Sequence, residues 1–199
     1  MLTAIDPDRK GNRVWKVTIP PTLEPVSVEE LKSFARIDGS GEDNLLASFI
    51  ESARQKLEDY TGRAFLEQTM VMLMDWWSEK EVYLPKPPLL SVTSIETLDE
   101  DGVATTYAAA NYFVVTESIP GKIIVKSETS LPLNTVRDYA GYKITYKAGY
   151  GTNPNQVPRQ IRNSILQLAT LRFEKRISDE EIPSEVTKEL RHMRVRQRG

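Results

Sequence analysis

The sequence contains no cysteine and only one histidine, His192. The lack of cysteine excludes disulfides, thiolate catalysis and thiolate metal sites, and it agrees with a reducing compartment. A single histidine likewise excludes a histidine-rich metal site. The chain also lacks any run of about 18 apolar residues, so no membrane span is expected, and residues 1–10 are too polar for a secretory signal. We therefore expect a protein that acts where it is made.

Strong net charge is absent as well. The formal net charge is −2, which argues against a surface that binds nucleic acid as a whole, although a local basic patch remains open. Hydrophobic residues make up 40% of the 199 residues, enough to fill the core of one domain. Disorder throughout the chain is therefore not expected.

No constellation for catalysis or for holding a cofactor or metal is found. Gly149 and Gly151 precede a helix, but no Gly-Lys-Ser/Thr follows and Pro158 removes a donor, so a structural turn is favoured over a phosphate loop. The acidic run at residues 99–102 is too short for an EF-hand loop and predicts a hairpin turn instead. His192 has no carboxylate or serine motif beside it and is interpreted as a surface residue. A hydrolase or transferase is therefore disfavoured, and no cofactor or metal is expected.

Helical signals lie at both ends of the chain. A helix is predicted from Val26 to Asp38, with Ser27 as N-cap, Glu30 completing a capping box, and Gly39 as the stop. A second amphipathic helix follows and ends near Gly62. A third begins at Pro158 and runs to Arg176, with apolar residues at helical spacing: Ile161, Ile165, Leu168 and Leu171.

The middle of the chain has a period of two. About six strands are predicted, at residues 69–77, 81–84, 91–98, 112–116, 122–126 and 142–147, with 103–107 as a possible seventh. In the last of them Tyr142, Ile144 and Tyr146 alternate with polar residues, so one face should be buried. The fold class is therefore α+β: a small helical bundle of two N-terminal helices and a long C-terminal helix, with an inserted antiparallel sheet or sandwich.

The expected organisation has four parts. Residues 1–25 are interpreted as an extended leader, in which an apolar alternation at residues 14–19 could add a strand or arm. Residues 26–66 and 154–177 form the helical core, and residues 67–150 form the β-rich subdomain. Residues 178–199 are interpreted as a basic tail, disordered or projecting in the isolated protein, in which Val186, Leu190 and Met193 could form a short amphipathic helix.

Four segments in this order resemble the head-to-tail connector proteins of tailed phages, also called head completion or adaptor proteins. They are PVSVEELKSFARID followed by DNLLASFIESARQKLEDYTGRAF, then the β-rich middle, then YKITYKAGYG, then VPRQIRNSILQLATLRFEKR. The likeness covers about residues 25 to 177.

The resemblance implies a non-enzymatic virion protein at the head-tail junction of a phage or prophage, synthesised in the bacterial cytoplasm. Such a subunit forms a ring of about twelve copies beneath the portal and around the DNA channel. Its implied partners are the portal protein, a tail-side connector or stopper protein, other copies of itself, and the passing DNA without sequence specificity; no membrane is implied. A ring needs two different complementary patches on each subunit.

Two groups of residues are candidates for the portal or subunit interface. The basic group is Arg172, Lys175, Arg176, Lys188, Arg191, Arg194 and Arg196. The apolar group is Met72, Trp76 and Trp77, which belong to a strand that is apolar on both faces. Either group also has a structural interpretation, as a solvated helix face or as a strand buried on both sides. The basic helix and tail leave open an alternative function, a DNA-binding module, which would bind duplex DNA with a steep salt dependence.

Overall fold

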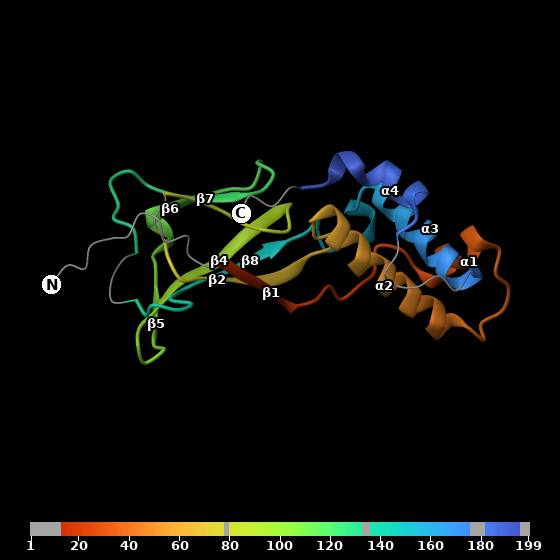
Figure 1. Cartoon of the computed structure of the whole chain (residues 1–199), viewed down its shortest axis with the longest axis horizontal. Coiled ribbons are helices and arrows are strands. Elements are labelled where there is room, and N and C mark those ends of the chain that lie inside the picture. The colour runs from red at the N-terminus through yellow and green to blue at the C-terminus, as the bar shows by residue number, and fades with distance from the viewer. Residues whose placement is uncertain (1–12, 78–79, 133–135, 176–181, 196–199) are drawn as a thin grey trace.

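The computed structural model describes residues 13–77, 80–132, 136–175 and 182–195, and they form an elongated molecule with two halves (Figure 1). Within these residues, four α-helices make up one half, and eight strands in two antiparallel sheets make up the other. The α+β fold class expected from the sequence is confirmed.

The first helix, α1 (Val28–Ala35), begins as its sequence predicts. Ser27 Oγ accepts a hydrogen bond from the Glu30 N–H at 3.1 Å, and the Ser27 N–H donates to the Glu30 carboxylate at 2.9 Å. This reciprocal pair is a capping box. The predicted stop at Gly39 is wrong, because Arg36 already takes the left-handed conformation with φ 55° and its N–H closes the helix on Lys32 O.

The second and third helices form the centre of the helical half. α2 (Asp43–Thr61) ends at Gly62 with φ 70°, as predicted. α3 (Arg159–Lys175) begins after Pro158, whose carbonyl accepts hydrogen bonds from two N–H groups of the first turn. α3 packs against α1 and α2. Three short 3₁₀ helices lie elsewhere in the described chain: η1 (Ala109–Asn111), η2 (Pro154–Gln156) and η3 (Arg191–Met193).

The C-terminal segment joins this half, contrary to expectation. α4 (Ser184–Leu190) packs on α3, and Val186 and Leu190 are fully buried in the helical core. The amphipathic spacing is confirmed, but the interpretation of a disordered or projecting tail is wrong for residues 184–195. Four helices therefore share one core, whose buried side chains include Leu31, Leu46, Ile50, Leu57, Ile161, Ile165, Leu168, Val186 and Leu190.

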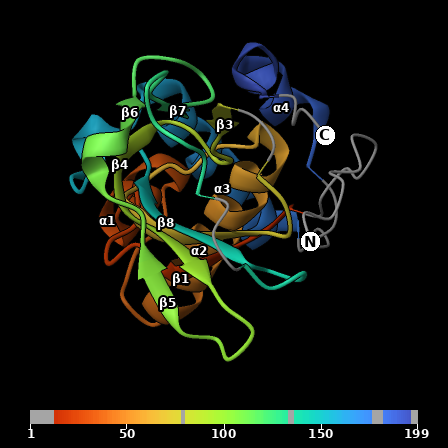
Figure 2. The same cartoon turned by 90° about the vertical axis from the view of Figure 1, so that its left-hand side faces the viewer.

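Two antiparallel sheets form the β half, and Figure 2 views them from that end. The larger sheet has the order β1 (Arg13–Ile19), β2 (Gln68–Met74), β8 (Tyr142–Ala148), β4 (Leu89–Leu98) and β5 (Ala104–Thr106). The smaller sheet has the order β3 (Glu81–Tyr83), β7 (Lys122–Val125) and β6 (Tyr112–Val115). All seven strands expected in the middle of the chain are present, the tentative one as β5.

The expected leader supplies the eighth strand. β1 pairs with β2 from Arg13 opposite Met74 to Ile19 opposite Thr69. Residues 13–19 are therefore part of the sheet and not a separate arm, while residues 1–12 of the predicted leader lie outside the described part of the chain.

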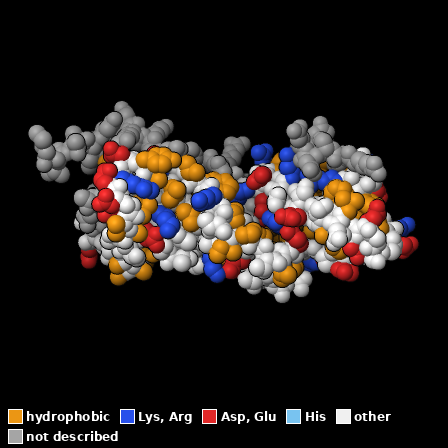
Figure 3. All heavy atoms as spheres, turned by 90° about the horizontal axis from the view of Figure 1, so that it is seen from below, with side chains coloured by type: hydrophobic (Ala, Val, Ile, Leu, Met, Phe, Trp, Pro, Cys, Tyr) orange, Lys and Arg blue, Asp and Glu red, His pale blue; other side chains and the backbone are white. Residues whose placement is uncertain are grey.

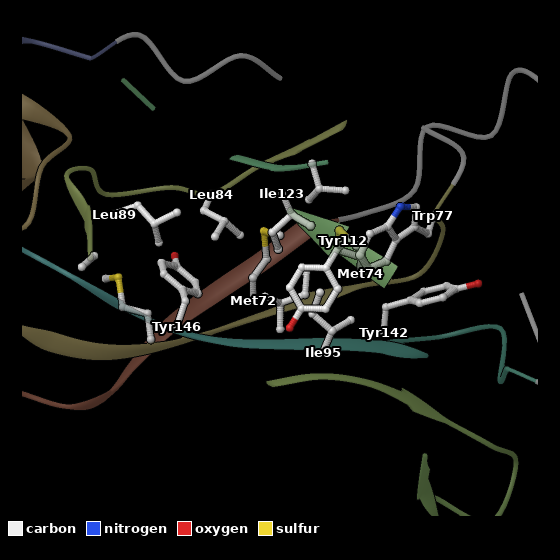
Figure 4. Close-up of a cluster of buried hydrophobic side chains, with 14 of the residues drawn as sticks. Met72, Met74, Trp77, Leu84, Leu89, Ile95, Tyr112, Ile123, Tyr142 and Tyr146 are labelled. Atoms are coloured by element: carbon white, nitrogen blue, oxygen red, sulfur yellow. The ribbon is translucent and has the colours of Figure 1, made fainter. Parts of the chain in front are cut away.

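A hydrophobic core fills the space between the two sheets (Figure 4). β8 alternates as predicted, with Tyr142, Ile144 and Tyr146 buried. The Tyr146 hydroxyl donates to Pro85 O at 3.1 Å, and burial raises the pKa of this phenol. From the smaller sheet, Tyr112 and Ile123 point into the same core.

The two halves meet at the loop after β8. Gly149 has φ 130°, and a Cβ there would lie 2.3 Å from Leu66 O, so only glycine fits. Tyr150 N–H donates to Phe65 O, and Gly151 O accepts from Glu67 N–H. The end of the β half is thus bonded to the segment that follows α2.

Candidate functional site

The basic candidates occupy different environments in the helical half. Lys175 is exposed at the end of α3, and Lys188 is exposed on α4. Arg191 and Arg194 are exposed in and after η3. Two further candidates, Arg176 and Arg196, lie outside the described residues.

Arg172 belongs to the core and not to the surface. Only 1% of the residue is exposed, and its Nη1 donates to Ser52 Oγ on α2. A guanidinium held between two helices stabilises their packing, because removing a buried hydrogen-bonding partner leaves the other group unsatisfied. Arg172 is therefore a structural residue in this chain and not an accessible contact for a portal or a neighbour.

Lys188, Arg191 and Arg194 form what we call the basic tail surface. Its position is fixed by backbone contacts with the end of α2. Val195 N–H donates to Thr61 O at 2.8 Å, and Arg194 Nε donates to Tyr60 O at 3.2 Å. The Arg194 guanidinium also lies 4.8 Å from the centre of the Tyr60 ring, a cation–π contact. The charged side chains of Lys188, Arg191 and Arg194 therefore belong to a segment that is packed against the end of α2.

Arg194 also complements the helix dipole of α2, because it contacts Tyr60 in the last turn of that helix. Cations near a helix C-terminus are favourable because the last carbonyl groups carry partial negative charge. Among the described residues, no salt bridge involves Lys188, Arg191 or Arg194. Their charges are thus not neutralised by a neighbouring carboxylate within that part of the chain.

A groove of about 530 Å³ lies beside this surface, where the helical and β halves meet. Most of its lining is apolar, and His192 borders it. Arg63 connects two other lining residues of the groove: its Nε donates to Met193 O at 2.7 Å, and its Nη1 donates to the Tyr150 hydroxyl at 3.4 Å. The lining residues are Arg63, Pro88, Leu90, Ile119, Gly149, Tyr150, Pro158, His192 and Met193.

The apolar candidates are divided by burial. Met72 is 2% exposed and Trp77 is 1% exposed, and both face the core between the sheets (Figure 4). Trp77 also meets Tyr142 edge to face, with ring centres 5.8 Å apart. Trp76 is half-buried. Of the three, only Trp76 retains surface that another molecule could contact.

A cluster of buried charges was not predicted from the sequence. Arg54 Nη1 donates to the Glu58 carboxylate at 3.1 Å, and its Nε donates to Glu24 at 2.7 Å. Glu58 also accepts from the Phe65 N–H and from Gln68 Nε2, each at 2.7 Å. Burial raises the pKa of Glu58, although the charge of Arg54 opposes this shift. The helical spacing of Arg54 and Glu58, four residues apart, is the only sequence signal for this pair.

The same cluster ties the two halves together. The Lys86 ammonium donates to Glu58 O at 3.1 Å and to Asp59 at 2.8 Å, and it lies 5.2 Å from the centre of the Trp15 ring. Each of these charges has a partner within the fold, so the cluster is structural. Among the described residues, no group of three or more acidic or histidine side chains is placed to hold a metal, and no helix is long and apolar enough to cross a membrane.

Known proteins match the chain in sequence and in structure. Residues 25–101 match the family described as phage gp6-like head-tail connector protein. No curated protein matches the chain. The matched residues include α1, α2, β2, β3 and β4.

Three similar solved structures come from gene transfer agent (GTA) particles. A chain from the virion of the native particle has a TM-score of 0.78 and 22% identity, covering 94% of this chain and 98% of that one. A chain from the neck of the empty particle, computed with C6 symmetry, has a TM-score of 0.77 and 21% identity over the same shares. A chain from the neck of the native particle, computed with C12 symmetry, has a TM-score of 0.74 and 23% identity, covering 95% and 97%. Residues 25–101 thus resemble the phage head-tail connector family in sequence, and the fold is shared along nearly the whole chain with these particle proteins.

Proposed function

We propose that this protein is a structural component of a virion that joins the head to the tail, and that it performs no catalysis. The observation that carries the proposal is the match of residues 25–101 to a connector family, in a chain whose fold is shared over 94% of its length with a neck protein. The interactions that such a function needs are burial and charge matching between subunits. Among the described residues, the buried charges of Arg54, Glu58 and Lys86 have partners within the chain, which is consistent with a structural role.

The second part of the proposal concerns assembly. Similar chains occur in necks computed with C6 and with C12 symmetry, which supports a ring for this protein too. We infer a ring of about twelve copies around the DNA channel, with the portal protein on one side and a tail-side connector or stopper protein on the other.

The basic tail surface is our candidate for the portal contact. Lys188, Arg191 and Arg194 are exposed, are held by a packed segment, and have no acidic partner among the described residues. Lys175 at the end of α3 adds a further exposed positive charge. A fixed array of unneutralised cations favours an acidic protein surface, because little conformational entropy remains to be lost on binding.

Negative-stain microscopy of the protein mixed with the portal protein of the same phage or prophage tests the proposal. We expect a ring at the tail-side end of the portal. A portal with no density there would contradict the assignment.

A pair of variants tests the surface separately. Replacing Lys188 and Arg191 with glutamate should weaken portal binding at least about tenfold, because two attractive contacts become repulsive. The matched control replaces Lys80 and Arg159, which are exposed elsewhere, with the same change in net charge. Equal weakening in both variants would rule out a local contact.

The DNA-binding alternative predicts a different outcome. A module that binds duplex DNA through the basic tail surface would bind tightly without the portal, with affinity falling steeply as salt rises. The connector function predicts weak binding to free duplex. Fluorescence anisotropy with labelled duplex at two salt concentrations separates the two.

A further inference from the structure

Within the described part of the chain, the larger sheet ends in two edges that no further strand covers. β1 lies at one edge and β5 at the other. Six of the seven residues of β1 and all three of β5 are exposed. Among the described residues, the backbone pairs of these strands are only with β2 and β4, on their inner sides. An exposed strand edge is a template for pairing with another chain.

The two edges carry opposite charge. Arg13 and Lys16 lie on β1, whereas Glu100 and Asp101 lie in the turn that leads into β5; all four are exposed. None of the four takes part in a salt bridge within the described residues. Both edges also expose valine: Val14 is 50% exposed, Val17 40% and Val103 61%. The edges are therefore complementary in charge and alike in apolar character.

The strand order also fixes direction. Every neighbouring pair in the larger sheet is antiparallel, so β1 and β5, four strands apart, run the same way. Both strands therefore begin at the same end of the sheet, where β1 has Arg13 and β5 has the acidic turn. Placing β5 of one copy beside β1 of the next brings these opposite charges together.

The register gives the residues that would meet. Val14 is opposite Leu73, which is opposite Lys143, which is opposite Glu96, which is opposite Thr106. Val14 and Thr106 are thus at one level and on one face of the sheet. A rotation about an axis parallel to the strands would carry one copy onto the next at the same level.

We propose that neighbouring copies of this chain join edge to edge, with β5 of one copy beside β1 of the next as a parallel pair. This inference rests on the proposed function and names the contact that builds the ring. It supplies the two different patches that a head-to-tail ring requires. Because β5 is only three residues long, its backbone pairing with β1 of the next copy needs further contacts, which the acidic turn and Val103 would provide.

The width of the larger sheet is compatible with a ring around a DNA channel. With strands about 4.8 Å apart, five strands advance about 24 Å per copy, so about twelve copies would place the sheets at a radius of about 46 Å. Such a ring leaves room inside for duplex DNA. The outer face of the larger sheet, seen from below in Figure 3, carries hydrophobic, acidic and basic side chains in small groups, so no single sign of charge opposes its continuation.

Cross-linking tests the contact directly, because the chain has no cysteine of its own. The double variant Val14→Cys with Thr106→Cys is mixed with the portal protein of the same phage and oxidised with diamide. We expect a ladder of covalent oligomers. The control, Val14→Cys with Thr105→Cys, places the two thiols on opposite faces of the sheet and should give at most a trace of the ladder.

Microscopy of the same samples separates the two proposals. Rings on the portal without a ladder would overturn the edge contact and leave the proposed function intact. No rings at all would overturn both. Where the cysteine variants do not fold, charge reversal gives the answer: Arg13→Glu should reduce ring formation about tenfold, and adding Asp101→Arg should restore it. A double variant no better than Arg13→Glu would overturn the pairing.

Discussion

Truncation of Leu190 tests whether the C-terminal segment belongs to the helical core. Leu190 lies on α4, is fully buried, and is grouped with the core side chains of α2 and α3. Glu189, its neighbour on the same helix, is exposed. Leu190→Ala and Glu189→Ala therefore make a matched pair in which only the first removes buried apolar atoms.

The expected magnitude follows from the burial. Leucine-to-alanine changes in a core cost about 2 to 5 kcal/mol, through lost transfer free energy and the cavity that remains. Because α4 packs chiefly on α3 at the outside of the bundle, where the site can partly collapse, we expect about 2 to 3 kcal/mol for Leu190→Ala. Glu189→Ala should change the free energy of unfolding by less than about 0.5 kcal/mol.

Urea denaturation with two probes measures the effect. The three tryptophans, at positions 15, 76 and 77, all lie in the β half, whereas far-ultraviolet circular dichroism follows mainly the helices. We expect Leu190→Ala to lower the midpoint of both signals together, because the Glu58 and Lys86 cluster couples the halves. Equal midpoints for Leu190→Ala and Glu189→Ala would refute the packing of α4.

Two further predictions concern the junction of the halves. Gly149→Ala should destabilise the fold by about 1 to 3 kcal/mol or more, because φ 130° is strained for alanine and the new Cβ would overlap Leu66 O; Gly41→Ala, with open space around it, is the control. Thermal denaturation would measure this loss of stability, and equal melting temperatures for the two variants would contradict the close approach of Gly149 to Leu66 O. Burial raises the pKa of Glu58 above its ordinary value of 4.5, so the carboxyl group binds its proton more tightly in the folded chain than in the unfolded chain. The contribution of Glu58 to the free energy of unfolding therefore falls as the pH rises from about 4.5 through the raised pKa. Glu58→Gln should lack this fall in urea midpoints measured between about pH 4 and pH 8, and an unchanged pH profile would count against a raised pKa.

Local signals in the sequence predicted most of the elements. The Ser27 capping box, the Gly62 terminus and the alternation of β8 each depend on a few neighbouring residues, and each is present in the structure. The strands of the middle were predicted for the same reason. Secondary structure that depends on neighbouring residues can therefore be predicted from the residues of the segment itself.

Placement relative to distant segments was harder to predict. Val186 and Leu190 showed a helical face, but the surface that receives it comes from α3, and nothing in the tail itself specifies that contact. Arg172 looked like part of a solvated basic face, yet Ser52 on α2 provides it with a buried partner. Met72 lies on a strand that is apolar on both faces, so its sequence could not say which face meets the core and which meets a neighbour.

The helical half is made from both ends of the chain, and this order has a consequence for biosynthesis. α1 and α2 leave the ribosome before strands β2 to β8, while α3 and α4 follow these strands. The buried faces of the first two helices therefore lack partners until α3 and α4 have been translated, whereas strands β2 to β8 emerge in one stretch. Since η3 and Val195 contact Thr61 and Arg63, the helical half is complete only after residues 191–195 have been released. An incomplete nascent chain thus lacks the finished surfaces from which a ring would be assembled.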